Sequence, residues 1–131
     1  MNDIHIVRNQ VGAFQCDPAD VLDKKHEFPG AAALVAKLQP LYDKTPVSQG
    51  RRKATALLSK ADIQAIHQEY DKLEGAVHTQ LNMLQTIAHN YVAHDKPEKA
   101  EEVLQVASVI YMMKEAIEQT CRPEMMAAVD R

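Results

Sequence analysis

The sequence predicts an all-α protein in which a long antiparallel helical hairpin, about residues 59–94 and 96–122, carries one or two short N-terminal helices packed across it. Apolar residues recur at spacings of three and four throughout residues 59–122, which is the period of an amphipathic helix. Helix-stop and helix-start residues interrupt that pattern at His94-Asp95-Lys96-Pro97. The chain has no tryptophan, four glycines and an aromatic fraction of 5%, a composition that disfavours sheet-rich folds.

The first long helix is predicted to begin at Ser59. The Ser59 hydroxyl can accept the backbone N–H of Asp62, whose carboxylate can reach back to the backbone of Ser59. The apolar stripe then fits a heptad with Ile63, Tyr70, Val77, Leu84 and Tyr91 at a positions and Ile66, Leu73, Gln80, Ile87 and His94 at d positions. Gln80 and His94 are the polar residues of this stripe.

The reversal between the two helices follows from three residues. Asp95 is predicted to be an N-cap, Pro97 is tolerated in a first turn, and Glu98 completes an Asp-x-x-Glu box. A connection this short makes the two long helices antiparallel neighbours. Pro123 is predicted to end the second helix, because the residue before a proline is biased out of the helical region.

The second helix is apolar almost all round over residues 103–113, so the hairpin alone cannot bury it. The N-terminal segments, a second copy of the chain or a different protein must cover the remainder. Methionines there and in the tail suit an adaptable contact surface. The predicted interface residues are Val103, Leu104, Ala107, Ile110, Tyr111, Met112, Met125 and Met126.

The length of 131 residues indicates one helical domain. Its predicted parts are an arm or short strand at 1–16, short helices at 17–43, a linker at 44–58, the hairpin at 59–122 and a tail at 123–131. Within the second part, Asp17-Pro18 starts a helix that Phe28-Pro29-Gly30 ends. A second helix, 31–41, has Pro40 breaking its last turn and is the best candidate to cover residues 103–113.

No pattern of residues indicates a catalytic, cofactor or metal site. The chain has six histidines, of which His67, His78 and His89 lie eleven apart, about 16 Å along a helix and too far for one metal ion. His94, beside Asp95, is either a titrating group at the hairpin tip or a cap for the end of the first helix. The net charge of −3 argues against nucleic acid as the main partner.

The two cysteines, Cys16 and Cys121, lie far apart and show no metal-binding spacing. They are either two reduced thiols, which a chain without a signal peptide favours, or one disulfide. No apolar run approaches the roughly 20 residues needed to cross a bilayer. We therefore expect a soluble, cytoplasmic protein, although a protein exported without a signal peptide would share these features.

Two segments resemble known families. Residues 95–104, Asp-Lys-Pro-Glu-Lys-Ala-Glu-Glu-Val-Leu, resemble the start of the second helix of a tetratricopeptide repeat. Stacked repeats need about three units to bury a core and this chain has one, so no repeat fold is predicted. The polar turn followed by Leu104-Gln105 and an apolar helix with a short tail is similar to the inner-rod subunits of type III secretion systems.

These observations favour a non-enzymatic protein–protein interaction protein, such as an adaptor, chaperone or inhibitor, that binds a macromolecular partner through an apolar helix face. The alternative is a self-assembling subunit of a larger complex such as a secretion apparatus, as the second resemblance implies. A small enzyme or a nucleic-acid-binding regulator is less favoured, because no site for either is visible.

Overall fold

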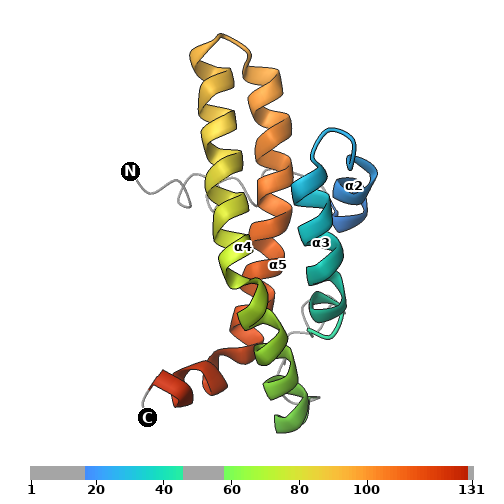
Figure 1. Cartoon of the computed structure of the whole chain (residues 1–131), viewed down its shortest axis with the longest axis vertical. Coiled ribbons are helices and arrows are strands. Elements are labelled where there is room, and N and C mark those ends of the chain that lie inside the picture. Colours follow the sequence, from blue (N-terminus) through green and yellow to red (C-terminus); the bar gives the residue numbers. More distant parts are fainter. Residues whose placement is uncertain (1–16, 46–57, 130–131) are drawn as a thin grey trace.

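The structure is a bundle of helices arranged around a long hairpin. The computed structural model describes residues 17–45 and 58–129, with side chains through residue 122. Its helices are α2 (Pro18–Asp23), α3 (Pro29–Tyr42), α4 (Lys60–Ala93) and α5 (Pro97–Val129), and no described residue lies in a strand. In Figure 1, α4 and α5 run antiparallel, α3 lies along one side of them, and α2 packs beside α3. The predicted all-α hairpin is therefore confirmed, whereas the arm or strand at 1–16 and most of the predicted linker lie outside the described residues.

The start of α4 is the one that the sequence predicts. The backbone N–H of Asp62 donates to Ser59 Oγ at 3.0 Å, and the backbone N–H of Ser59 faces Asp62 Oδ2 at 3.4 Å. Both halves of the capping box are therefore present, and they satisfy backbone donors that the first helical turn leaves without partners.

The turn between α4 and α5 differs from the prediction, because Asp95 closes α4 and does not cap α5. Asp95 has φ 61°, in the left-handed region. Its backbone N–H donates to the Val92 carbonyl at 3.1 Å, and that of Lys96 donates to the Tyr91 carbonyl at 2.8 Å. This pair of bonds is a Schellman motif, which usually places glycine where Asp95 lies. Aspartate suits both an N-cap and a left-handed position, so its presence does not distinguish the two.

The N-terminal prolines also occupy helices differently from the prediction. Pro29 does not end a helix; it begins α3, because a first-turn residue needs no backbone N–H. The preceding helix, α2, ends at Asp23. Pro40 lies inside α3, which continues to Tyr42, and so it does not break the last turn.

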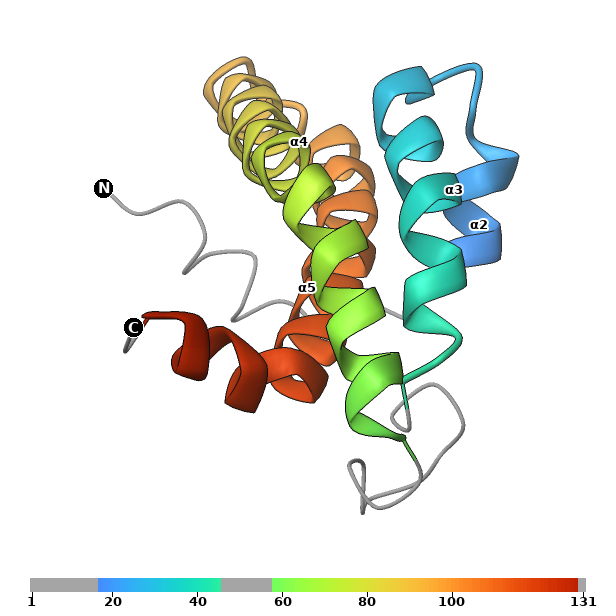
Figure 2. The ribbon, with the colours of Figure 1, turned by 60° about the horizontal axis from the view of Figure 1, so that its bottom comes forward.

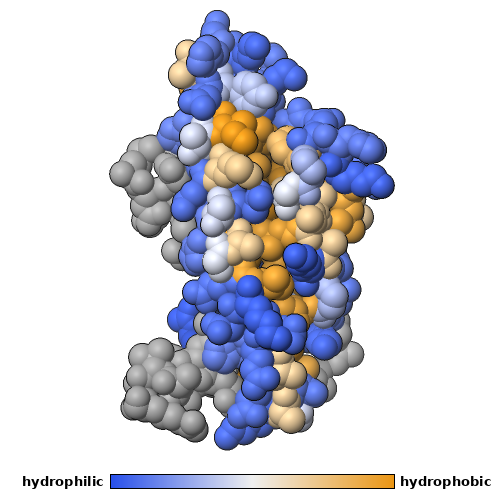
Figure 3. Space-filling view, in the orientation of Figure 1, coloured by the Kyte–Doolittle hydropathy of each residue, from blue (hydrophilic) through white to orange (hydrophobic). Residues whose placement is uncertain are grey.

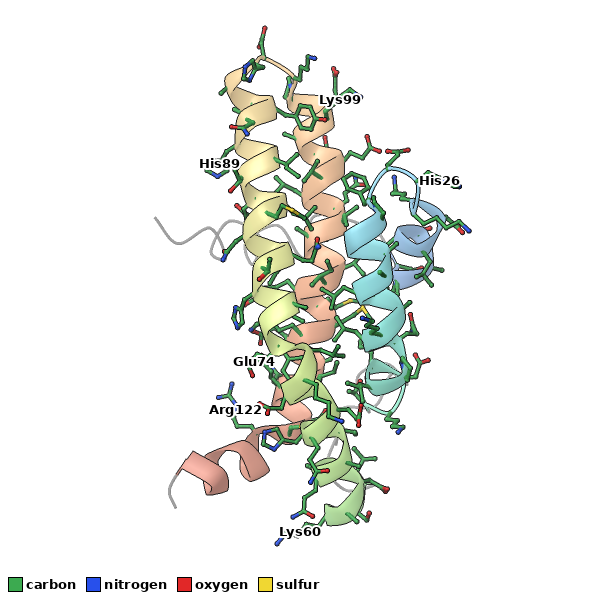
Figure 4. All side chains as sticks on the ribbon, viewed as in Figure 1. His26, Lys60, Glu74, His89, Lys99 and Arg122 are labelled. Carbon is green, nitrogen blue, oxygen red and sulfur yellow. The ribbon has the colours of Figure 1, made fainter. Side chains whose placement is uncertain are left out.

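The prediction that Pro123 ends the second helix is wrong. The structure continues α5 to Val129. Figure 2 shows that the C-terminal part of α5 turns away from the axis of the hairpin, and Figure 4 places Arg122 where the turn begins. A proline inside a helix removes one backbone hydrogen bond and kinks the helix without having to end it.

The core lies where α3 packs against the hairpin. The predicted buried side of α3 is confirmed, since Leu34, Val35, Leu38 and Leu41 are all buried. They join buried residues of both long helices, which include Ile66, Tyr70, Val77, Leu81 and Leu84 of α4 and Val103, Val106, Ile110, Met113 and Ile117 of α5. The N-terminal helices thus supply part of the cover that residues 103–113 need.

Candidate interaction surface

A groove lies between α3 and α4 and continues toward the hairpin tip. We call it the α3–α4 groove. It is lined by Phe28, Gly30, Ala33, Leu34 and Lys37 on one side, by Leu73, Ala76, Thr79, Gln80, Ile87 and Tyr91 on the other, and by Lys99, Glu102 and Val103 of α5 together with Glu27 near the tip. Figure 3 shows apolar side chains gathered along the face between these two helices.

The groove contains two hollows. The one toward the tip has a volume of about 580 Å³ and lies where the hairpin extends past the beginning of α3. The other, about 250 Å³, lies between Gly30 and Lys37 of α3 and the middle of α4. A neighbouring hollow of about 420 Å³, lined by Ile87, Asn90, Tyr91, His94 and Lys96, extends the surface to the end of α4.

Helix geometry explains why these side chains share one face. Leu73, Gln80, Ile87 and Tyr91 recur at intervals of seven and four, so they form one stripe along α4. All four are half-buried, and Ala76 on the same side is exposed. The stripe that the sequence assigns to the hairpin core is therefore wider than α5 can cover, and its edge forms one wall of the groove.

Gln80, one of the two polar residues of the predicted d series, lies beside Gly30, where α3 comes close to α4. A Cβ at Gly30 would lie 2.6 Å from Gln80 Nε2, so glycine leaves room for this side chain. Gln80 Oε1 is buried and has no hydrogen-bond partner. Gln80, which interrupts the apolar stripe of α4, thus lies beside the first turn of α3.

The predicted interface residues are largely inside the molecule. Val103, Ala107, Ile110 and Tyr111 are buried. Leu104 and Met112 are half-buried, and the side chains of Met125 and Met126 lie outside the described ones. Most of the apolar surface of residues 103–113 is thus occupied within the chain, and Val103 alone of this set lines the groove.

A smaller hollow of about 220 Å³ lies on α4 and α5 near the tip, lined by Ala88, His89, Val92 and Leu104. Val92 is 62% exposed, an unusual position for a large apolar side chain. Figure 4 shows His89 pointing away from α3, so this hollow and the groove open on different sides of α4. The tip therefore has apolar surface on two sides.

Tyr70, Lys114 and Glu118 form a polar cluster that joins α4 to α5. The buried Tyr70 hydroxyl donates to Glu118 Oε2 at 2.6 Å, and Lys114 Nζ donates to Glu118 Oε1 at 3.1 Å. Burial, and then the hydrogen bond to Glu118, raise the pKa of Tyr70 far above its usual value. A tyrosine that remains neutral and a carboxylate with two partners suit a structural link better than acid–base catalysis.

The predicted histidine and cysteine positions indicate no further site. His94 ends α4, and its Nδ1 lies 2.7 Å from the Asn90 carbonyl oxygen, as expected for a cap. Cys121 is buried, with Sγ 3.8 Å from the Ile63 carbonyl oxygen, and Cys16 lies outside the described residues. Within 17–45 and 58–129, no three His, Cys, Asp or Glu side chains are grouped to hold a metal ion.

Comparisons with known proteins identify no relative of this chain, so the interpretation of the groove rests on the structure. No protein-family model, curated protein or solved structure matches this chain. Among the described helices, none combines the length and the apolar character needed to cross a bilayer.

Proposed function

We propose that this chain is a non-enzymatic interaction protein that binds a helix of a partner protein in the α3–α4 groove. The groove itself carries the proposal, because two packed helices with apolar side chains along the groove between them form a docking site for the apolar face of a third helix. Such a contact would complete the bundle along the side that α3 leaves open. An adaptor, a chaperone or an inhibitor could each work in this way.

A second candidate is a self-assembling subunit of a larger complex. The hollow around Val92 and Leu104 favours it, because a subunit that polymerises needs two surfaces and the tip has apolar side chains on two sides. Growth of such an assembly would pair the groove of one copy with the exposed tip of another.

Substitutions at Ala76 test the first candidate. Ala76 lines the groove and is exposed, so a long side chain there should obstruct docking and leave the fold intact. Ala65 is exposed on the same helix and lines none of the hollows described above, so it provides the matched control. Ala76→Glu and Ala76→Arg are compared with Ala65→Glu and Ala65→Arg, which add the same charges elsewhere.

The readout is quantitative mass spectrometry of proteins recovered from an extract of the source cells on each purified variant. We expect partners retained by the wild type and by both Ala65 variants to be lost from both Ala76 variants. Equal recovery on all five proteins would show that the groove is not the contact. Light scattering across a wide concentration range distinguishes the self-assembling subunit from the first candidate. A self-assembling subunit should form oligomers, and Val92→Glu should dissociate them.

A further inference from the structure

We infer that the partner helix is acidic, with carboxylates flanking its apolar face; this rests on the proposed function. Lys37, Lys96 and Lys99 line the groove and its extension at the tip. None of the three forms a salt bridge with another residue of the described part of the chain. These ammonium groups therefore remain available to a ligand.

The carboxylates of the groove do not cancel this charge. Glu102 already pairs with Lys24, at 3.6 Å between Nζ and Oε1. Glu27 is thus the one groove-lining carboxylate without a salt bridge among the described residues, against three lysines. Among the side chains that line these hollows, lysines therefore outnumber carboxylates, whereas the chain as a whole has a net charge of −3. Such a surface favours an acidic partner and repels a basic one.

The length of the groove and the positions of the lysines along it together set the length of the partner helix. Leu73 and Tyr91, at opposite ends of the groove, are eighteen residues apart, which corresponds to about 27 Å of helix. Lys37 lies toward the Leu73 end, and Lys96 lies beyond Tyr91. Figure 4 shows Lys99 near the same tip. A helix of about five turns with carboxylates near both ends would satisfy all three lysines.

Three synthetic amphipathic peptides of about 18 residues test this inference. They share one leucine face and differ only in having glutamate, glutamine or lysine at the flanking positions. Their dissociation constants for the full chain are measured by fluorescence anisotropy at about 20 mM and about 500 mM NaCl. At low salt we expect the glutamate peptide to bind about tenfold more tightly than the lysine peptide, since each exposed ion pair contributes a factor of about two or more. High salt should reduce this ratio to about twofold.

Charge reversal on the protein supplies the matched control. The triple variant Lys37→Glu, Lys96→Glu, Lys99→Glu should reverse the order of the glutamate and lysine peptides. The triple variant Lys25→Glu, Lys44→Glu, Lys60→Glu changes exposed lysines that line none of these hollows and has the same net charge, so it should keep the original order. Equal preferences in the two triple variants would overturn the inference.

The peptide with glutamine separates this inference from the proposed function. If all three peptides bind equally well and Ala76→Glu and Ala76→Arg both prevent binding, the helix docks but its charge is not selected. If none of the peptides binds, docking of a helix in the groove is also wrong. A dimer of the chain alone that Ala76→Glu dissociates would assign the groove to a second copy and overturn the acidic partner.

Discussion

The two long helices of the hairpin have similar lengths and very different surroundings. α4 buries one stripe and leaves the rest of its surface exposed or half-buried. By contrast, every residue of α5 from 106 to 111 is buried, which places buried side chains on all sides of the helix. A helix buried all round organises a core, whereas an amphipathic helix keeps a face for other molecules. The surface available to a partner is therefore found mainly on α4, although α5 has the more apolar sequence.

Buried polar groups show the same contrast. On α5, Ser108 and Thr120 each donate a hydrogen bond to a carbonyl of the preceding turn, at 2.7 and 2.8 Å, and Lys114 pairs with Glu118. On α4, Gln85 is completely buried, and neither polar atom of its amide has a hydrogen-bond partner. The buried polar side chains of α5 thus find hydrogen-bond partners on the same helix. The buried Gln85 amide of α4 does not, and it lowers the stability of the fold.

The largest expected effect comes from a charge inside α5. Ile110→Asp should lower the free energy of unfolding by about 3–5 kcal/mol, because it leaves a carboxylate unpaired in the core. Val92→Asp, at an exposed position of α4, should change it by about 0.5 kcal/mol or less. Urea unfolding of both variants measures the difference, and equal losses would contradict the contrast between the helices.

Removing the polar link between the helices should have the next largest effect. Tyr70→Phe deletes the hydrogen bond to Glu118 and should lower the free energy of unfolding by about 1–2 kcal/mol. The raised pKa of Tyr70 has a second consequence, because above about pH 10 the unfolded chain loses the phenol proton and the folded chain retains it. Stability of the wild type should therefore fall as the pH rises through this range, and the fall should be smaller in Tyr70→Phe. Parallel pH profiles would show that the hydroxyl is not held as described.

Gln85→Met should stabilise the protein by about 1–2 kcal/mol, because an unbranched apolar side chain replaces an unpaired buried amide of similar length. Gln68→Met, at an exposed position of the same helix, is the control and should leave the thermal midpoint nearly unchanged. A loss of stability in Gln85→Met would mean that the amide has a partner that matters.

The turn that joins the helices allows a smaller test. Asp95→Gly should raise the free energy of unfolding by about 0.5–1 kcal/mol, because glycine adopts the left-handed region without the strain that a Cβ causes. Asp95→Ala should give no such gain. A destabilised Asp95→Gly would instead favour a capping role for the carboxylate, and thermal melting distinguishes the two.

A similarly small effect is expected on the exposed face of α4. Gly75 lies inside this helix, and a Cβ there would meet no atom within 4 Å. Gly75→Ala should therefore stabilise the protein by about 0.5–1 kcal/mol through helix propensity alone. Gly30→Ala should gain less, because its Cβ would force the Gln80 amide to move. Equal gains in melting temperature would show that α3 and Gln80 do not constrain each other.

Several features of the fold follow from the sequence because they depend on interactions between near neighbours. The Ser59 capping box joins residues three apart, and the heptad stripe follows from the period of the helix. The reversal near residue 95 also needs only local signals. Local signals were ambiguous where one residue suits two roles, and so Asp95 and Pro123 were assigned wrongly.

The candidate site could not be predicted in the same way. Periodicity gives the angle of a side chain around its helix axis, but it does not say which neighbour lies at that angle. The sequence by itself determined that α4 and α5 form a hairpin with more apolar surface than the two can bury. The tertiary structure alone decided that α3 packs on α5 and leaves Ile87 and Tyr91 of α4 half-buried, because packing between distant segments depends on shape and on close approach at single points such as Gly30.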